Sequence, residues 1–200
     1  LHLCNKNMEN MDTNNNHGKA KDNLLLEVCM AAKYEGETLT RHHTPHQQTN
    51  NDSASQLCTV LARSFADIGD IVRGKDLYLG NKKKNQQVRE RDQLEKNLKE
   101  IFENIYNDVM STKGAEARYK KDEDGNYSKL REDWWTANRE TVWKALTCDA
   151  RDNAEYFRKT PCAGTSPIQG YCRCDGDKPG VDKPNTDPPT YFDYVPQYLR

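Results

Sequence analysis

Seven cysteines are the most chemically constrained residues of the chain: Cys4, Cys29, Cys58, Cys148, Cys162, Cys172 and Cys174. Cysteines form disulfides, bind zinc, or stay reduced and buried. Structural zinc sites favour thiols separated by two to four residues, with histidines at similar spacing. Cys172 and Cys174 have a single residue between them, and His42, His43 and His46 lie far away in a polar segment. We therefore expect disulfides rather than zinc or reduced thiols, and the odd number leaves one thiol without a partner in this chain.

A second group with chemical potential is a cluster of five cations, with Glu90 as the only acid between positions 81 and 91: Lys82, Lys83, Lys84, Arg89 and Arg91. Two interpretations remain open. The cluster is either a solvated loop between helices or a site for an anionic ligand, because several fixed cations beside a helix start attract anions. Lys120 and Lys121 form a weaker cluster, since three acids follow them directly.

Other polar and aromatic residues have structural explanations. Asp67 and Asp70 could serve acid chemistry or metal binding, but the spacing of Asp70 and Arg73 favours an ion pair within one helix. The tryptophans Trp134, Trp135 and Trp143 could form a platform for sugars. We expect core packing instead, because Trp134 falls on an apolar stripe.

No motif predicts catalysis. The chain has neither a phosphate-binding loop nor a nucleophile elbow. A Cys/His metalloenzyme is conceivable from five His and seven Cys, yet no local signature supports it. We expect no enzyme activity, no metal and no cofactor.

The elements that carry these residues are predicted to be helices joined by long loops. Apolar residues recur at spacings of three and four along each helix, and no segment alternates as a strand would. Asp22 is expected to cap the first helix, and Ser53 with Gln56 forms a capping box for the second. The predicted helices cover residues 23–35, 53–73, 85–111, 128–148 and 149–157, with a polar linker at 40–52 and a Cys/Pro-rich loop at 161–196.

Composition limits the class of protein further. The 200 residues are 34% hydrophobic and 30% charged, with a net charge of −1. So few hydrophobic residues predict a small apolar core, which disulfides would stabilise by about 2–4 kcal/mol each. Disulfides in turn indicate an oxidising compartment or a cell surface. The near-zero charge argues against a nucleic-acid partner. No run approaches the ~18 apolar residues of a membrane span, and no signal-peptide pattern opens the chain.

Several motifs together resemble the Duffy-binding-like domains. Cys58 is followed after eight residues by Asp-Ile-Gly-Asp-Ile-Val-Arg-Gly-Lys-Asp at 67–76, and Arg-Glu-Asp-Trp-Trp at 131–135 precedes Val142 and Trp143. The segments at 1–5 and 27–36 are similar to the alpha class at the head of variant erythrocyte membrane protein 1, a family of malaria-parasite adhesins. The ending at 191–200 resembles the segment that leads into the last helical part of such domains.

The resemblance implies an all-α, disulfide-stapled fold with three helical subdomains, of which this chain would be an incomplete copy. Residues 1–52 would be a partial first subdomain with one helix and Asn-rich loops. Residues 53–200 would be most of the second, a helical bundle with a Cys/Pro-rich C-terminal loop. We predict that Cys29 pairs with Cys148, that Cys58 pairs with Cys174 or Cys172, and that Cys162 takes the one left over. Cys4 would then be unpaired.

The resemblance also implies a function. The chain would be a host-receptor-binding module on the surface of the infected erythrocyte, attached to the membrane only through a distant segment of the full-length protein. Its partners would be glycosaminoglycans or glycoproteins of erythrocytes or endothelium, bound in cytoadhesion or rosetting, and the cation cluster would hold sulfated glycans. The alternative is an antigenically variable scaffold whose neighbouring domain binds the receptor. Asn51 and Asn126 begin glycosylation sequons whose use depends on the host cell.

Overall fold

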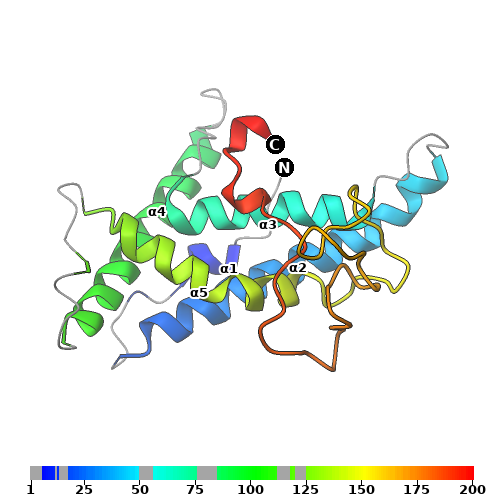
Figure 1. The fold of residues 1–200 in the computed structure, drawn as a ribbon. Coiled ribbons are helices and arrows are strands. Elements are labelled where there is room, and N and C mark those ends of the chain that lie inside the picture. The colour runs from blue at the N-terminus through cyan, green and yellow to red at the C-terminus, as the bar shows by residue number, and fades with distance from the viewer. Residues whose placement is uncertain are drawn as a thin grey trace.

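A computed structural model describes residues 6–11, 13, 18–49, 56–75, 85–111, 118–119 and 125–200, with the side chains of 6, 9, 44–49 and 85–90 outside the description. Throughout these residues the regular structure is helical (Figure 1). The elements are α1 (Lys6–Glu9), α2 (Ala20–Thr49), α3 (Leu57–Arg73), α4 (Asn85–Met110), α5 (Ser128–Leu146), and the short 3-10 helices η2 (Phe192–Tyr194) and η3 (Gln197–Leu199). The predicted all-α class is therefore confirmed.

Helix α2 is much longer than the sequence predicted. It starts at Ala20 rather than Asn23 and runs on to Thr49, so most of the segment expected as a polar linker at 40–52 is helical. The prediction stopped where apolar residues become rare. Polar residues continue the helix because they bond along it: the Arg41 guanidinium pairs with Glu37 four residues earlier, and the His42 ring bonds the Thr38 carbonyl at 2.8 Å.

The predicted end of helix α3 is confirmed, and its predicted start is wrong. Its last residue is Arg73, and Gly74 follows with a left-handed φ of 69° that glycine adopts without strain. At the other end Gln56 is the N-cap, and its side chain makes no capping hydrogen bond. The predicted capping box needs Gln56 three residues inside the helix, so it does not form as expected; its partner Ser53 lies outside the described residues.

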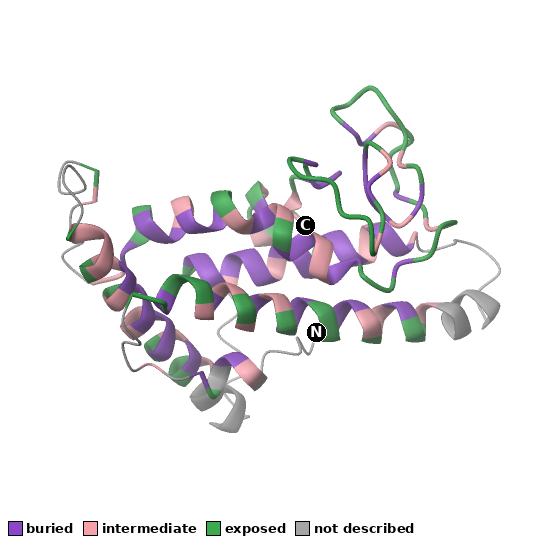
Figure 2. Cartoon of the chain, turned by 90° about the horizontal axis from the view of Figure 1, so that it is seen from below, coloured by how far each residue is buried: buried purple, intermediate pink, exposed green. Residues whose placement is uncertain are grey.

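The core lies where α5 packs against α2 and α3 (Figure 2). Phe65 of α3 packs between two tryptophans of α5, with its ring centroid 5.1 Å from both: its ring is tilted against Trp135 and edge-on to Trp143. Gly36 lets α2 approach α5 closely, since a Cβ at that position would lie 1.9 Å from the carbonyl oxygen of Leu146. This core contains residues from before and after position 52, where the boundary between the two subdomains was predicted.

Residues 147–190 form an irregular segment that wraps around one end of the bundle before the chain returns over α3 (Figure 1). The helix predicted at 149–157 is absent from it. Its backbone forms turns instead, and its Glu155 carbonyl accepts the Cys58 amide at the start of α3 at 3.0 Å. Tertiary hydrogen bonding has replaced the helical pattern, so the prediction is wrong here.

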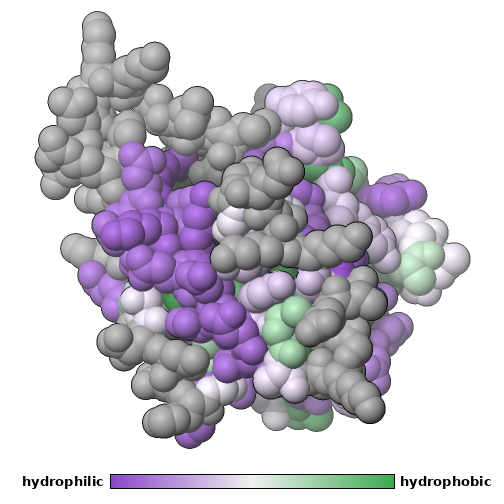
Figure 3. Space-filling model, turned by 90° about the vertical axis from the view of Figure 1, so that its left-hand side faces the viewer, coloured by the Kyte–Doolittle hydropathy of each residue, from purple (hydrophilic) through white to green (hydrophobic). Residues whose placement is uncertain are grey.

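Helix α4 matches the predicted range to within one residue and packs against α2, α1 and α5. Viewed from the side where α4 lies, the described surface is mainly hydrophilic (Figure 3). None of the described helices is both long and apolar enough to cross a membrane.

Candidate functional site

The predicted cation cluster lies mostly beyond the described structure. Lys82, Lys83 and Lys84 are outside the described residues, and Arg89 lies in α4 with its side chain outside the description. Only Arg91 is placed in full, half-buried on α4. The surface that follows it along α4 carries charges of both signs, because Asp92, Lys96 and Glu103 are exposed. A glycan site at the cluster therefore stays a prediction.

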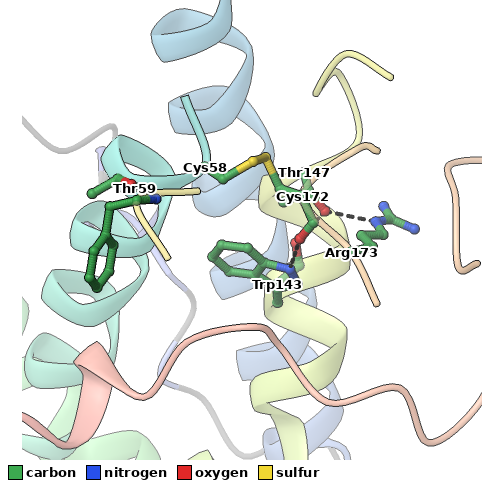
Figure 4. The surroundings of a disulfide bond; sticks show 7 residues. Cys58, Thr59, Trp143, Thr147, Cys172 and Arg173 are labelled. Atoms are coloured by element: carbon green, nitrogen blue, oxygen red, sulfur yellow. Dashed lines mark hydrogen bonds between the residues drawn. A yellow bond between two sulfur atoms is a disulfide. The ribbon is translucent and has the colours of Figure 1, made fainter. Parts of the chain in front are cut away.

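Two disulfides staple the irregular segment. Cys58, at the start of α3, is bonded to Cys172 across 114 residues (Figure 4). Cys162 is bonded to Cys174 across 12 residues. The first bond is one of the two pairings predicted for Cys58, and the second follows from it. These four cysteines are consequently excluded as zinc ligands.

The predicted disulfide between Cys29 and Cys148 is not formed. Both residues are free thiols in the structure. Burial, together with the nearby Cys148, raises the pKa of Cys29 to about 11. Cys148 instead donates its Sγ hydrogen to the Lys144 carbonyl at 3.3 Å. Both thiols are therefore kept in the protonated form, which does not attack sulfur. Cys4 lies outside the described residues.

The long-range disulfide sits in a polar framework that the sequence analysis missed. Trp143 donates its indole N–H to the Cys172 carbonyl at 3.0 Å, and Arg173 donates to the Thr147 hydroxyl at 2.8 Å (Figure 4). The buried Arg173 guanidinium also pairs with Asp182 at 2.6 Å. Because an unpaired buried guanidinium is costly, these bonds fix residues 172–183 against the end of α5.

A second buried network fastens the C-terminal segment to α5. Arg139 forms a two-pronged pair with Asp193, at 2.8 and 3.0 Å, and donates to the Thr190 carbonyl at 2.8 Å. Asp193 also accepts the Trp135 indole N–H at 2.9 Å. Burial opposes the charge on Arg139, but the bonds and attraction of Asp193 outweigh it and raise the Arg139 pKa. Such geometry is what allows a charge pair to persist in a protein interior.

The aspartates of α3 are linked to this network through Arg73, which donates to the Asp193 carbonyl. Asp70 bonds Arg73 at 3.0 Å, which confirms the predicted ion pair. Arg200 pairs with Asp67 at 3.1 Å and also with Asp70. These carboxylates are thus engaged with arginines, and Arg200 attaches residues 191–200 to α3.

The three tryptophans are core residues, as predicted. Trp134, Trp135 and Trp143 are all buried, and Trp134 packs edge-on against Phe102 of α4. Exposed aromatics are found elsewhere, at Tyr34, Phe157, Tyr191, Tyr194 and Tyr198. Within the described residues, no group of three or more His, Cys, Asp or Glu side chains is arranged to hold a metal ion.

A small pocket of about 200 Å³ lies between the later part of α2, the start of α3 and residues 151–155. Polar groups from all three segments line it, including Thr40, His43 and Arg151. No sequence pattern indicates this pocket, because its residues come from segments predicted to be a linker, a capping box and a helix.

Comparison with known proteins identifies the family. The sequence model described as the Duffy binding domain matches residues 1–200, while no curated protein matches the chain. Among solved structures, the NTS-DBL1-alpha and CIDR-gamma double domain of PfEMP1 from the varO strain of Plasmodium falciparum is 43% identical over 99% of this chain and 25% of its own, with a TM-score of 0.72. An ICAM-1-binding PfEMP1 DBLbeta domain is 28% identical over 100% of this chain and 39% of its own, with a TM-score of 0.66. The chain thus spans well under half of either solved chain, and it belongs to the Duffy binding domain family.

Proposed function

We propose that this chain is part of an adhesion module that binds a receptor on host erythrocytes or endothelial cells, and that it recognises anionic glycans. The observation that carries the proposal is likeness over almost the whole chain to a PfEMP1 DBL1-alpha domain at 43% identity. The DBLbeta relative described as ICAM-1-binding supports a receptor-binding role for this fold.

The binding chemistry of the proposal is electrostatic. Lys82, Lys83, Lys84, Arg89 and Arg91 would neutralise sulfates of a glycosaminoglycan such as heparan sulfate, with the release of counterions. Arginine would contribute more than lysine where it can make two parallel bonds to one sulfate. We further propose exposure on the infected erythrocyte, with membrane attachment through a distant segment and with roles in rosetting, virulence and antigenic variation.

Heparin chromatography tests the glycan part of the proposal. Replacing Lys82, Lys83 and Lys84 together by Glu should lower the salt concentration at which the folded protein elutes from immobilised heparin. We propose that these three lysines are exposed, so the free energy of unfolding should change by less than about 0.5 kcal/mol. A charge-matched control replaces the exposed Lys19, Lys21 and Lys33 of the α2 region by Glu.

The two triple variants separate a local site from overall charge. Elution at lower salt of the first variant alone supports a glycan site at the cluster. An equal shift of both variants would show that retention depends on net charge only. No retention of the unaltered protein would favour the alternative function, that of a helical and antigenically variable scaffold whose neighbouring domain carries the binding.

A further inference from the structure

An exposed phenylalanine in the irregular segment presents one side of its ring to solvent. Phe157 is 52% exposed. Its ring lies nearly parallel to that of Phe192, with the centroids 5.7 Å apart, and is tilted against that of Tyr156, with the centroids 4.7 Å apart. The centroids of Tyr156 and Phe192 are only 6.3 Å apart, so both rings lie on the same side of Phe157. The opposite side of the Phe157 ring is therefore the exposed one.

Hydrogen bonds fix this ring in place. The Phe157 backbone N–H donates to the Thr59 hydroxyl of α3 at 3.0 Å, and the Tyr156 hydroxyl donates to the Thr190 hydroxyl at 3.1 Å. The Thr190 hydroxyl also accepts the backbone N–H of Phe192 at 3.1 Å. A group that is already ordered loses little conformational entropy when a ligand binds. The Phe157 ring is thus a preformed aromatic platform, held by α3 and by the chain end.

Three exposed cations lie close to Phe157, either along the chain or on α3. Arg158 and Lys159 follow it directly, and Arg63 lies one helical turn beyond the α3 hydroxyl that bonds the Phe157 backbone. Among the described residues, none of the three forms an ion pair, whereas buried arginines of the core are paired. Burial raises the pKa of Tyr156 and the charge of Arg158 opposes that rise, so the Arg158 guanidinium lies near the Tyr156 ring.

Acids near the platform do not cancel this positive charge. Asp67 lies one turn beyond Arg63 on α3 and is paired with Arg200, and Glu155 lines the small pocket that faces α2. Residues 151–159 and Arg63 together carry two more positive than negative side chains, in a chain whose net charge is −1. The surface around Phe157 therefore combines an open aromatic ring with an excess of positive charge, which attracts anions.

We propose that the Phe157 platform binds one sulfated sugar ring of a host glycan. The C–H groups on one face of the sugar would pack on the open side of the Phe157 ring, whose face is electron-rich. Sulfates on the sugar would accept hydrogen bonds from Arg63 and Arg158, with Lys159 adding charge. An acidic peptide would need only the cations and an apolar partner only the ring, whereas a sulfated sugar carries both parts on one rigid ring. This inference rests on the proposed glycan-binding function and gives that function a site on described residues, apart from the Lys82 cluster in sequence.

Isothermal titration of the whole 200-residue chain with a sulfated heparin-type disaccharide tests the platform. Phe157→Leu keeps an apolar side chain but removes the flat ring, and should weaken binding about tenfold, as is typical when a flat group loses its aromatic stacking partner. Tyr198→Leu removes an aromatic ring that is 75% exposed near the chain end, and as the matched control should leave the affinity unchanged. The desulfated disaccharide should bind too weakly to measure, because the cations would have no anion to hold.

The cations have a test of their own, which separates their contribution from that of the ring. Arg63→Gln and Arg158→Gln should each weaken binding of the sulfated disaccharide about fivefold at low salt. This effect should shrink as salt is added, because ions screen exposed charges, whereas the effect of Phe157→Leu should persist. Lys21→Gln, which removes an exposed charge on α2, is the control and should bind as the unaltered protein does.

Each outcome decides the proposal. Binding that both Phe157→Leu and the arginine variants weaken supports the platform. Absence of disaccharide binding overturns it, and so does equal affinity of the Phe157→Leu and unaltered proteins. If Phe157→Leu lowers the melting temperature, Arg158→Gln decides alone, because it changes only an exposed charge. Equally tight binding of a poly-glutamate peptide would show a site for acidic peptides instead.

Failure of the platform can be told apart from failure of the proposed function. Heparin retention that depends on Lys82, Lys83 and Lys84, with no effect of Phe157→Leu on disaccharide binding, would overturn the platform and leave the function standing. Absence of both heparin retention and disaccharide binding would overturn both.

Discussion

At the scale of single residues, the described structure depends on buried arginines that are matched to particular acceptors. Arg139 and Asp193 are 6% and 1% exposed, and the two residues come from α5 and the chain end. Asp193 also holds the Trp135 indole, so one carboxylate joins a helix, a core aromatic ring and the C-terminal segment. The pair therefore matters for the position of the chain end.

Replacing Asp193 by Asn should be among the most damaging single changes. The amide keeps the shape but leaves the Arg139 charge buried without its counter-ion, which typically costs about 3–5 kcal/mol. Urea denaturation measures the change in the free energy of unfolding. Asp92→Asn, at an exposed position on α4, serves as the control and should change it by less than about 0.5 kcal/mol. A loss for Asp193→Asn as small as that of the control would show that the pair is dispensable.

The two free thiols should differ in reactivity. With its pKa raised to about 11, Cys29 carries roughly one thiolate per thousand molecules at pH 8. Cys148 is exposed and should be alkylated by iodoacetamide first. The rate at Cys29 should rise about tenfold per pH unit up to its pKa, since only the thiolate reacts. Peptide mass spectrometry follows both sites; a Cys29–Cys148 cross-linked peptide in a non-reduced digest would contradict the structure.

At the scale of elements, the close approach of α2 to α5 depends on a missing side chain. A Cβ on Gly36 would meet the backbone oxygen of Leu146 at 1.9 Å, whereas a Cβ on Gly69 would meet only the Trp135 side chain, at 2.8 Å. Backbone yields less easily than a side chain. Gly36→Ala should therefore destabilise by about 3 kcal/mol or more, and by more than Gly69→Ala. Melting temperatures of the two variants rank them, and the opposite order would be incompatible with this helix packing.

The disulfides should contribute unequally to stability. Cys58–Cys172 closes a loop of 114 residues and Cys162–Cys174 a loop of 12. In the chain-entropy description, the longer loop gains about 2 kcal/mol more from its bond. Paired Cys→Ala variants of each bond, compared by denaturant unfolding, measure the difference. Equal losses would indicate that local packing rather than loop closure sets the contribution of each bond.

Sequence periodicity could predict some elements and not others, for physical reasons. The apolar stripe of α4 runs to the helix end, so Asn85–Met110 was predicted almost to the residue. The later part of α2 is polar and gave no stripe, and residues 149–157 use their backbone groups for tertiary bonds. The pairing of Arg139 with Asp193 spans 54 residues, and only the folded chain brings such partners together. The same holds for the pocket that contains Thr40.

At the scale of the whole molecule, a thin apolar core is complemented by two disulfides and buried ion pairs. Long-range covalent and ionic bonds of this kind hold irregular segments on a helical base, and loop sequences can then vary while the base is kept. This separation of scaffold from loops is consistent with an adhesion module that presents different surfaces on one fold.

Direct adhesion of the folded, disulfide-intact chain to human cells tests the proposed function most directly. The measurement compares binding to erythrocytes or endothelial cells before and after enzymatic removal of heparan sulfate, over a range of salt concentrations. We predict saturable binding that falls steeply as salt rises and that drops when heparan sulfate is removed. Absence of binding, or binding unaffected by both treatments, would contradict the proposal that this chain recognises anionic host glycans.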